Sequence, residues 1–413
     1  MSMDRITCIE DLREIHKRRV PKAFFDYVDR GSYSEQTYRA NCDDLQAIKF
    51  RQRILVDISR RDLATTILGE KANLPLICAP VGSTGMQYSD GEIHACRAAQ
   101  AAGIPYTLST MSINSIEDVA ENVEKPFWFQ LYVMKDRGFI KELIQRAMAA
   151  KCSALVLTVD LQVLGQRHAD IKNGLSVPPQ LFSIANMIDF MSKPSWLIGT
   201  LRAKRRNFGN IAGHVKGVDD LGSVSGWVAE QFDTSLNWKD VDWIRSIWPG
   251  KLVIKGILDT EDAEEAAKIG AEALVVSNHG GRQLDGARSS IEVLPEIVDA
   301  VGSKIEIMMD GGIRSGQDVM RALALGAKSC MIGRSYIYGL GAFGGPASPR
   351  RWRSSARSSA SPWGCAASTA SPRSTTAFWR FNARHWRPAF ACAQRRSRSH
   401  LVIMSTTSGS MPS

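Results

Sequence analysis

The sequence predicts an α/β protein with the TIM, or (β/α)8, barrel fold, and three observations lead to that prediction. Eight short apolar segments between residues 74 and 332 alternate with amphipathic stretches of helix length, a pattern typical of βα units that build a parallel sheet. Polar or glycine residues follow the end of every apolar segment. Glycine and then arginine recur after the last two segments, where barrels of this class often bind phosphate.

Residues 6–30 precede the barrel and predict an N-terminal helical segment. Ile6, Ile9, Leu12 and Ile15 recur at near-helical spacing, and Pro21 marks the start of a second helix. The eight strands are then expected, in chain order, at residues 74–79, 104–108, 127–131, 154–159, 252–254, 273–276, 305–309 and 329–332.

The connection after the fourth strand, residues 161–237, is much longer than the others. A connection of this length inside a compact domain is uncommon and is usually functional. Its middle holds apolar and aromatic residues and then a basic cluster: Phe182, Ile184, Met187, Ile188, Phe190, Met191, Trp196 and Leu197, followed by Arg202, Lys204, Arg205 and Arg206. This order fits a peripheral membrane anchor, and it equally fits a lid packed on the barrel with a solvated basic face.

The composition indicates a globular protein. The chain has 413 residues and is 44% hydrophobic, which is enough for a substantial core. Its eight cysteines have no C-x-x-C spacing, so we expect neither a disulfide framework nor a metal site. The first residues lack the apolar core of a signal peptide, and no apolar run reaches membrane-spanning length. We therefore expect a cytoplasmic protein with at most peripheral membrane contact.

The net charge of +10 is concentrated at one end of the chain. Residues 346–413 contain 11 Arg but no Lys, Asp or Glu, which leaves 41 basic and 42 acidic residues for the rest. The body of the protein is therefore close to neutral, and we expect no nucleic-acid binding from it. Only the tail could act as a basic interaction segment.

Residues 277–286, Ser-Asn-His-Gly-Gly-Arg-Gln-Leu-Asp-Gly, directly follow the sixth expected strand. His279 and Arg282 are three residues apart, so a loop at the strand's end can aim an imidazole and a guanidinium into one cavity. A histidine beside two glycines is by itself more often structural than catalytic. The pair nevertheless suits a substrate that carries both a proton to remove and a carboxylate to hold.

The other strand ends carry polar groups as well, and a buried polar group is costly unless it is used. In strand order these residues are Pro80 and Gly82, Ser109, Gln130 and Tyr132, Thr158 and Asp160, Lys255, Ser277 and His279, Asp310 and Arg314, and Gly333 and Arg334. The seventh and eighth ends, 310–314 and 333–334, combine glycine backbone with arginine and predict a site for a phosphorylated cofactor.

The string at 277–286 closely resembles the active-site signature of the flavin-dependent 2-hydroxy-acid dehydrogenases and oxidases, a family that includes glycolate oxidase, L-lactate dehydrogenase, mandelate dehydrogenase and flavocytochrome b2. Residues 21–31 resemble that family's N-terminal element, which places a tyrosine, here Tyr27, over the substrate pocket. Residues 164–167 resemble its loop-borne arginine, here Arg167. The resemblance extends from about residue 5 to about residue 345.

The resemblance implies FMN as the cofactor and assigns roles to the site residues. FMN would be bound by Pro80, Gly82, Ser109, Gln130, Thr158, Lys255, Ser277, Asp310, Gly311, Gly312, Arg314, Gly333 and Arg334. The substrate carboxylate would be held by Arg282 and Arg167, with Tyr132 and Tyr27 beside it. His279 would be the base, oriented by Asp160, and Lys255 would stabilise the reduced flavin. The residues leave open whether His279 removes the α-hydrogen or the hydroxyl proton.

The strings at 31–35, 79–82 and 255–259 look most like bacterial respiratory L-lactate dehydrogenases. This implies oxidation of L-lactate to pyruvate with electrons passed to a quinone, in a homo-oligomer, by resemblance a tetramer, on the inner face of the plasma membrane. Gly82 and Met111 replace an alanine and a tryptophan of glycolate oxidase, so the pocket should accept more than glycolate. Mandelate is the alternative substrate, and O2 is the alternative acceptor.

The resemblance stops after residue 345, which divides the chain into a barrel, 1–345, and a tail, 346–413. The tail is rich in Arg, Ser and Pro, lacks hydrophobic periodicity and replaces the family's final helix. We expect it to be disordered and attribute it to a frameshift. An inactive frameshifted product and a nucleic-acid-binding tail are alternatives from other classes. A different phosphate-binding barrel, such as an isomerase or an NAD-dependent nucleotide dehydrogenase, would explain the glycine sites but not Tyr27, Tyr132, Arg167 and Arg282 together.

Overall fold

The structure is a computed structural model that describes residues 6–52, 54–55, 62–175, 179, 181, 183–214, 227 and 230–344. The predicted tail, 346–413, lies outside the described residues, as do parts of the 161–237 connection.

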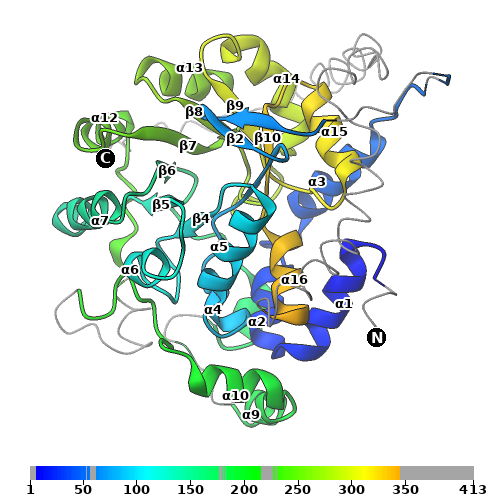
Figure 1. The fold of residues 1–413 in the computed structure, drawn as a ribbon, viewed down its shortest axis with the longest axis vertical. Coiled ribbons are helices and arrows are strands. Elements are labelled where there is room, and N and C mark those ends of the chain that lie inside the picture. Colours follow the sequence, from blue (N-terminus) through cyan, green and yellow to red (C-terminus); the bar gives the residue numbers. More distant parts are fainter. Residues whose placement is uncertain are drawn as a thin grey trace, which may run out of the picture.

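Eight parallel strands form the barrel at the centre of the molecule (Figure 1). They are β3 (Leu76–Cys78), β4 (Thr107–Ser109), β5 (Trp128–Tyr132), β6 (Ala154–Thr158), β7 (Lys251–Ile257), β8 (Ala273–Val276), β9 (Glu306–Met309) and β10 (Ser329–Ile332). Each strand pairs with its neighbours in chain order, and β10 pairs with β3. A parallel bridge between Cys78 and Tyr106 completes the ring. The predicted barrel is confirmed.

The predicted strand bounds lie within three residues of the observed ones, and the second strand shows why they differ. Gly103 ends the preceding helix in the left-handed conformation, at φ +70°. Pro105 then has no backbone N–H to give to the sheet. The strand therefore starts at Thr107, three residues after the first apolar residue of the run.

Successive side chains along each strand point to opposite faces of the sheet, so the strands contribute to two hydrophobic clusters. In β6, Ala154 and Val156 belong to the cluster inside the barrel. Leu155 and Leu157 instead belong to the larger cluster between the strands and the surrounding helices. Burial on both faces explains why these strands appear in the sequence as continuous apolar runs.

The helices after the barrel strands surround the sheet, and many begin at a polar capping residue. They are α4 (Thr84–Gln87), α5 (Gly91–Ala102), α6 (Ile116–Ala120), α7 (Arg137–Ala149), α12 (Trp238–Ile247), α13 (Thr260–Lys268), α14 (Ser290–Val301), α15 (Gly316–Ala324) and α16 (Arg334–Phe343). Ser315 is typical, because its side chain accepts a hydrogen bond from the backbone of Asp318 while Asp318 bonds back to Ser315.

A short hairpin that the sequence analysis did not predict covers the end of the barrel opposite the strands' carboxyl ends. Its strands are β1 (Thr65–Ile67) and β2 (Glu70–Ala72). Ile67 and Leu68 join the cluster inside the barrel. The backbone N–H of Leu68 donates to Glu306, at the start of β9, over 3.0 Å.

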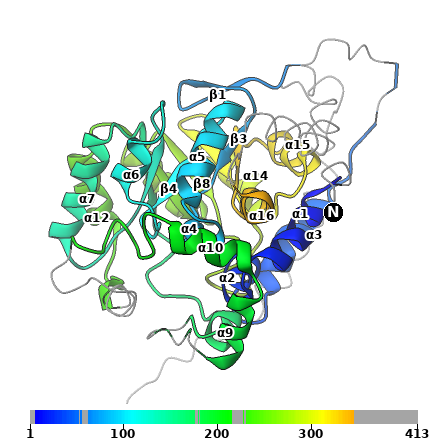
Figure 2. The same ribbon diagram turned by 60° about the horizontal axis from the view of Figure 1, so that its bottom comes forward.

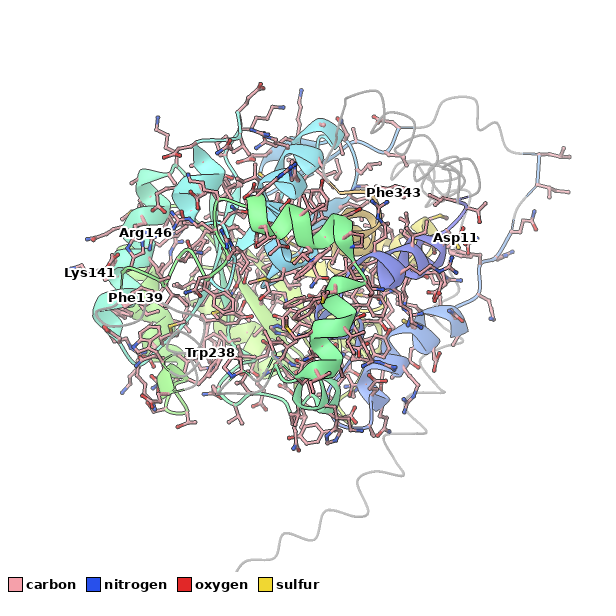
Figure 3. All side chains as sticks on the ribbon, turned by 90° about the horizontal axis from the view of Figure 1, so that it is seen from below. Asp11, Phe139, Lys141, Arg146, Trp238 and Phe343 are labelled. Atoms are coloured by element: carbon pink, nitrogen blue, oxygen red, sulfur yellow. The ribbon has the colours of Figure 1, made fainter. Side chains whose placement is uncertain are left out.

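The predicted N-terminal helices are present as α1 (Ile9–Arg19) and α2 (Lys22–Asp29), followed by α3 (Gln36–Ala47). In Figure 3, Asp11 of α1 and Phe343 of α16 lie on one side, and Phe139 of α7 and Trp238 of α12 lie on the other. Helix α1 packs on α16 through Leu12 and Ile337. Asp29 at the end of α2 accepts from Arg13 at 2.5 Å and from Tyr338 at 2.7 Å. These contacts fix α2, which carries Tyr27.

The long connection follows the fourth barrel strand, β6, as predicted, and contains α8 (His168–Lys172), α9 (Ile184–Met191) and α10 (Pro194–Arg202). The α9–α10 pair projects from the barrel (Figure 2). Phe190 and Trp196 stack on Phe24 of α2, with ring centroids 6.0 and 5.4 Å away. The outer side of the pair is apolar and exposed, with Ile184 at 82% and Met191 at 70% exposure.

The predicted basic cluster after α10 is divided between two roles. Lys204 lies 2.7 Å from Asp118 of α6, and Arg205 pairs with the same carboxylate. Arg202 and Arg206 are exposed. Part of the cluster therefore holds the connection to the barrel, and the other part faces solvent beside the apolar helices.

Candidate active site

His279 and Asp160 form the centre of the site, at the carboxyl ends of β8 and β6. Nδ1 of His279 lies 2.9 Å from Oδ1 of Asp160. Burial lowers the pKa of His279, although the charge of Asp160 and the hydrogen bond to it raise it in part. Burial alone would raise the pKa of Asp160, but the charge and hydrogen bond of His279 bring it below its usual value. The pair therefore combines an ionised carboxylate with a neutral imidazole that can accept a proton at Nε2.

The backbone after β8 aims the imidazole. His279 has φ +57°, a left-handed conformation that is uncommon for a residue other than glycine, and Gly280 and Gly281 continue it at +65° and +70°. A Cβ at Gly281 would lie 2.5 Å from the backbone of Tyr38. The two glycines of the predicted motif are thus required by conformation and by close packing.

A cationic corner lies beside His279, where two guanidinium groups approach the ring of Tyr27. Arg282 lies 4.7 Å from the ring centroid and Arg167 lies 6.0 Å from it. Arg282 also donates to the carbonyls of Tyr27 and, over 3.2 Å, of Arg30 at the end of α2. Burial and the nearby Arg167 lower the pKa of Arg282 to about 10. Arg167 also pairs with Asp170 at 3.3 Å. The two half-buried guanidinium groups repel each other, which favours an anion between them.

Tyr132 at the end of β5 closes the side of the site next to His279. Its hydroxyl lies 3.5 Å from Nε2 of His279, and the two rings are nearly parallel. Burial, followed by the charge of Asp160, raises the pKa of Tyr132. The phenol therefore stays protonated and can donate to a substrate oxygen.

Lys255 on β7 links the His279 loop to the loop after β9. Its ammonium group lies 2.9 Å from Ser277 Oγ and 2.9 Å from Asp310. Burial acts against the charge, but Asp310 and Asp160 raise the pKa of Lys255 above its usual value. Ser277 Oγ in turn accepts from the backbone of His279 over 3.1 Å. Lys255 is therefore a fixed buried cation.

The predicted phosphate end lies after β9 and β10. Gly311 and Gly312 have φ of +95° and +78°, and a Cβ at Gly312 would lie 2.1 Å from a backbone oxygen of Asn41. Arg314 donates to the carbonyl of Ile313 over 3.0 Å. Arg334 donates to the carbonyls of Val28, Gly280 and Arg30 over 2.8 to 3.0 Å. In this structure Arg334 thus ties α2 to the His279 loop, while Gly333 and Arg314 line the cavity.

One cavity of about 300 Å³ joins these groups. The predicted residues that line it are Tyr27, Pro80, Gly82, Tyr132, Thr158, Arg167, Lys255, His279, Arg282, Asp310, Gly311, Gly312, Arg314, Gly333 and Arg334. Ser109, Gln130, Asp160 and Ser277 lie behind this lining and are bonded to it or to one another. The structure therefore brings all the predicted site residues together.

Four buried polar atoms of the predicted site residues at the strands' carboxyl ends lack a hydrogen-bond partner among the described residues: Gln130 Nε2, Thr158 Oγ1, Asp160 Oδ2 and Asp310 Oδ1. A ligand that offers both donors and acceptors along these ends would satisfy them. The polar ring system of a flavin and its hydroxylated chain have this character, and Arg314 lines the same cavity as a cation that can pair with a phosphate. The residues present fit FMN.

The sequence analysis missed several lining residues, including Phe24, Met86, Asp170 and Leu181. Phe24 and Met86 lie on helices, and their hydrophobic character is equally typical of a core residue. It also missed the pair Asn41 and Asn278, whose side chains exchange two hydrogen bonds of 2.8 Å and hold the His279 loop. Asn278 is part of the predicted motif, but its partner is 237 residues away.

Comparison with known proteins agrees with this geometry. The family described as FMN-dependent dehydrogenase matches residues 16–350. Proteins named L-lactate dehydrogenase are 48% identical to the chain in Haemophilus influenzae, over 340 residues, and in Vibrio cholerae, over 341 residues. Each alignment covers 82% of this chain and 89% of the relative.

Among solved structures, the monotopic membrane protein (S)-mandelate dehydrogenase superposes with a TM-score of 0.81 at 34% identity, covering 92% of this chain and 100% of that one. A mandelate oxidase variant superposes with a TM-score of 0.71 at 33% identity, covering 87% and 94%. Among the described residues, no helix is both long and apolar enough to span a bilayer.

Proposed function

The chain belongs to the family of FMN-dependent dehydrogenases, and on that premise we propose that it oxidises L-lactate to pyruvate. It is an oxidoreductase with FMN as its cofactor. The observation that carries the proposal is the 2.9 Å pair of His279 and Asp160, in one cavity with Arg282, Arg167 and Tyr132. L-Lactate is preferred because the relatives at 48% identity bear that name.

In this proposal the substrate carboxylate lies between Arg282 and Arg167, and Tyr132 donates to a substrate oxygen. His279 accepts the proton that leaves either the α-carbon or the hydroxyl group, and Asp160 stabilises the imidazolium that forms. FMN, when bound, would take up the two electrons and the second proton that the substrate loses. Lys255, a buried cation, supports negative charge on the cofactor.

The cofactor contacts are part of the same proposal. The strand-end groups Pro80, Gly82, Ser109, Gln130, Thr158 and Ser277 hold the ring system and its chain. Asp310, Gly311, Gly312, Arg314, Gly333 and Arg334 hold the ribityl hydroxyls and the phosphate.

The electron acceptor is a membrane quinone, and the protein acts as a homo-oligomer, in our proposal a tetramer, on the cytoplasmic face of the membrane. The exposed apolar side of α9–α10, with Arg202 and Arg206 beside it, supports contact with an anionic bilayer. The structural neighbour described as a monotopic membrane protein supports the same arrangement.

The second candidate substrate is mandelate, which the structural neighbours and the small Gly82 favour. Turnover of L-lactate and of (S)-mandelate with a water-soluble quinone analogue, under air and under nitrogen, separates the candidates. We expect pyruvate formation with the quinone in both atmospheres. If (S)-mandelate is turned over faster than L-lactate, mandelate is the preferred substrate. If hydrogen peroxide forms at the rate at which substrate is lost, the protein is an oxidase.

We further propose that the barrel is residues 1–345 and that 346–413 is a tail outside the family, produced by a frameshift. The family match ends at residue 350. Resequencing the gene tests the proposal, since an unshifted reading frame would contradict it.

A further inference from the structure

Two loops of the barrel meet beside the substrate-binding part of the cavity, one after β3 and the other after β4. A Cβ at Gly82 would lie 3.2 Å from Cβ of Met111. The backbone N–H of Ser83 donates to the carbonyl of Met111 over 2.8 Å. Gly82 and Met111 both line the cavity, so the separation of the two loops determines its width there.

Glu92, in the first turn of α5, joins these loops through one oxygen atom. Its Oε1 accepts from the backbone N–H of Gly85 over 3.0 Å and from that of Ile113 over 2.9 Å. The side chain is completely buried and does not line the cavity. A Cβ at Gly85 would lie 2.6 Å from Cβ of Ile113, so α4, which directly follows the Gly82 loop, touches the Met111 loop at this point.

Asn210, from the long connection, holds the Met111 loop from another direction. Its Oδ1 accepts from the backbone N–H of Ile116 over 2.9 Å. Its amide group donates to the carbonyls of Ser109 and Thr110, over 3.3 and 3.2 Å, and to Ser112 Oγ over 2.9 Å. Asn210 is also completely buried and outside the cavity lining. The side chain thus binds both ends of the loop segment 109–116.

We propose that Glu92 and Asn210 are positioning residues that fix the Met111 loop against the Gly82 loop, and that they thereby determine which 2-hydroxy acid the pocket accepts. The selectivity part of this inference rests on the proposed function. Truncating either side chain leaves two or more buried backbone groups without a hydrogen-bond partner. Because unpaired buried groups are unfavourable in free energy, the loop is expected to shift until they find water or another partner. A loop that shifts away from Gly82 makes room for a substrate larger than L-lactate.

The test compares Glu92→Ala and Asn210→Ala with the wild-type FMN-loaded protein. We expect the ratio of kcat/KM for (S)-mandelate to that for L-lactate to rise about ten-fold in each variant, the scale of a hydrophobic pocket that changes by about a methylene group. We also expect faster amide hydrogen exchange in the peptide 107–116. If these residues only stabilise the fold, their loss reduces the fraction of folded enzyme and lowers the rates for both acids by the same factor. The ratio of the two kcat/KM values then stays unchanged.

Glu92→Gln keeps an oxygen that can accept from Gly85 and Ile113, so it should retain the wild-type ratio. The matched control is Glu292→Ala on α14, which removes the 2.9 Å ion pair with Arg288 and lies outside the segment 109–116 and its bonding partners. If Asn210→Ala does not fold, Asn210→Ser, whose hydroxyl is too short to reach the same groups, takes its place.

An unchanged ratio in the truncation variants, or unchanged exchange in 107–116, would overturn the proposal. If wild-type protein oxidises neither acid, the proposed function fails instead. The exchange measurement then still decides whether these residues fix the loop.

Discussion

His279 and Asp160 are 119 residues apart in the chain, and their side chains meet at 2.9 Å. The barrel makes this contact possible, because β6 and β8 both end at the same rim, one strand apart. A Cβ at Gly256, between them on β7, would lie 2.7 Å from Cβ of Asp160. The absence of a side chain there lets the carboxylate reach the histidine.

Replacing His279 with Gln should lower kcat for L-lactate by a factor of about 10² to 10⁴, because the proton acceptor is lost while a polar side chain of similar size remains. FMN content and thermal stability should change little. Steady-state kinetics and flavin absorbance measure both effects. His214→Gln, which alters an exposed histidine paired with Glu142, is the control. A kcat within a factor of about two of wild type would contradict the role of His279 as base.

Replacing Asp160 with Asn should move the acidic limb of the pH profile of kcat/KM to lower pH. Asp160 raises the pKa of His279 against the effect of burial, so its removal lowers that pKa further and the imidazole stays neutral in more acidic solution. The plateau should fall as well, because the imidazolium loses its counter-charge. Asp233→Asn, at a buried aspartate bound to Arg137, is the control. A limb that stays in place or moves to higher pH would contradict this account.

Replacing Arg282 with Lys should raise KM for L-lactate by about ten-fold or more, since lysine cannot present two parallel N–H groups to a carboxylate. The effect on kcat should be smaller. Initial-rate measurements over a range of L-lactate concentrations separate the two constants. Arg245→Lys, at a partly buried arginine beside Glu272, should leave KM unchanged. Equal KM values for both variants would exclude Arg282 from carboxylate binding.

His16 should make the fold less stable in mild acid. Burial, against the hydrogen bond to Gln87 at 2.9 Å, lowers the pKa of His16 to about 4. Its folded-state pKa lies below the unfolded value, so the stability it contributes is present above about pH 6.5 and is lost as the pH falls toward 4. At pH 5 the loss is about 2 kcal/mol.

The His16→Gln variant should therefore lose less stability than wild type between pH 7.5 and pH 5. Urea unfolding at the two pH values measures the difference. The comparison isolates His16, because the other titrating groups are common to both proteins. An identical pH dependence in the two proteins would contradict burial of a neutral imidazole at this position.

Replacing Ile188 of α9 with Glu should weaken binding to vesicles that contain phosphatidylglycerol, because its 65% exposed side chain lies on the apolar outer side of the helix pair. Turnover with a water-soluble acceptor should not change. Co-sedimentation with vesicles measures the binding. Ile54→Glu, at a 74% exposed apolar residue between α3 and β1, is the control. Equal binding by both variants would contradict the proposed membrane surface.

The order of apolar and polar residues predicted the barrel well, because every predicted apolar run between polar residues forms a barrel strand in the structure. The hairpin β1–β2 was missed because its six residues include Glu70 and Lys71, and only its packing under the barrel makes it a strand pair. The second strand was placed too early because Gly103 and Pro105 delay its start. The position at which a strand begins depends on backbone conformation, and the pattern of hydrophobic residues does not indicate that conformation.

For the site, the strand-end rule and the motif predicted residues that the structure gathers in and behind one cavity. The bonds of Arg334 to three carbonyls could not be predicted, because they depend on where α2 ends relative to β10. The same holds for Asn210, whose role depends on how the long connection returns to the β4 loop. Contacts between distant segments are a property of the folded chain.

The central claim is that this barrel holds FMN beside His279 and oxidises L-lactate. The most direct measurement is the absorption spectrum of the purified protein before and after anaerobic addition of L-lactate. The account predicts flavin bands that bleach on addition, with one pyruvate formed per flavin. Flavin bands that persist with L-lactate and with (S)-mandelate, in protein whose FMN content equals its active-site concentration, would contradict it.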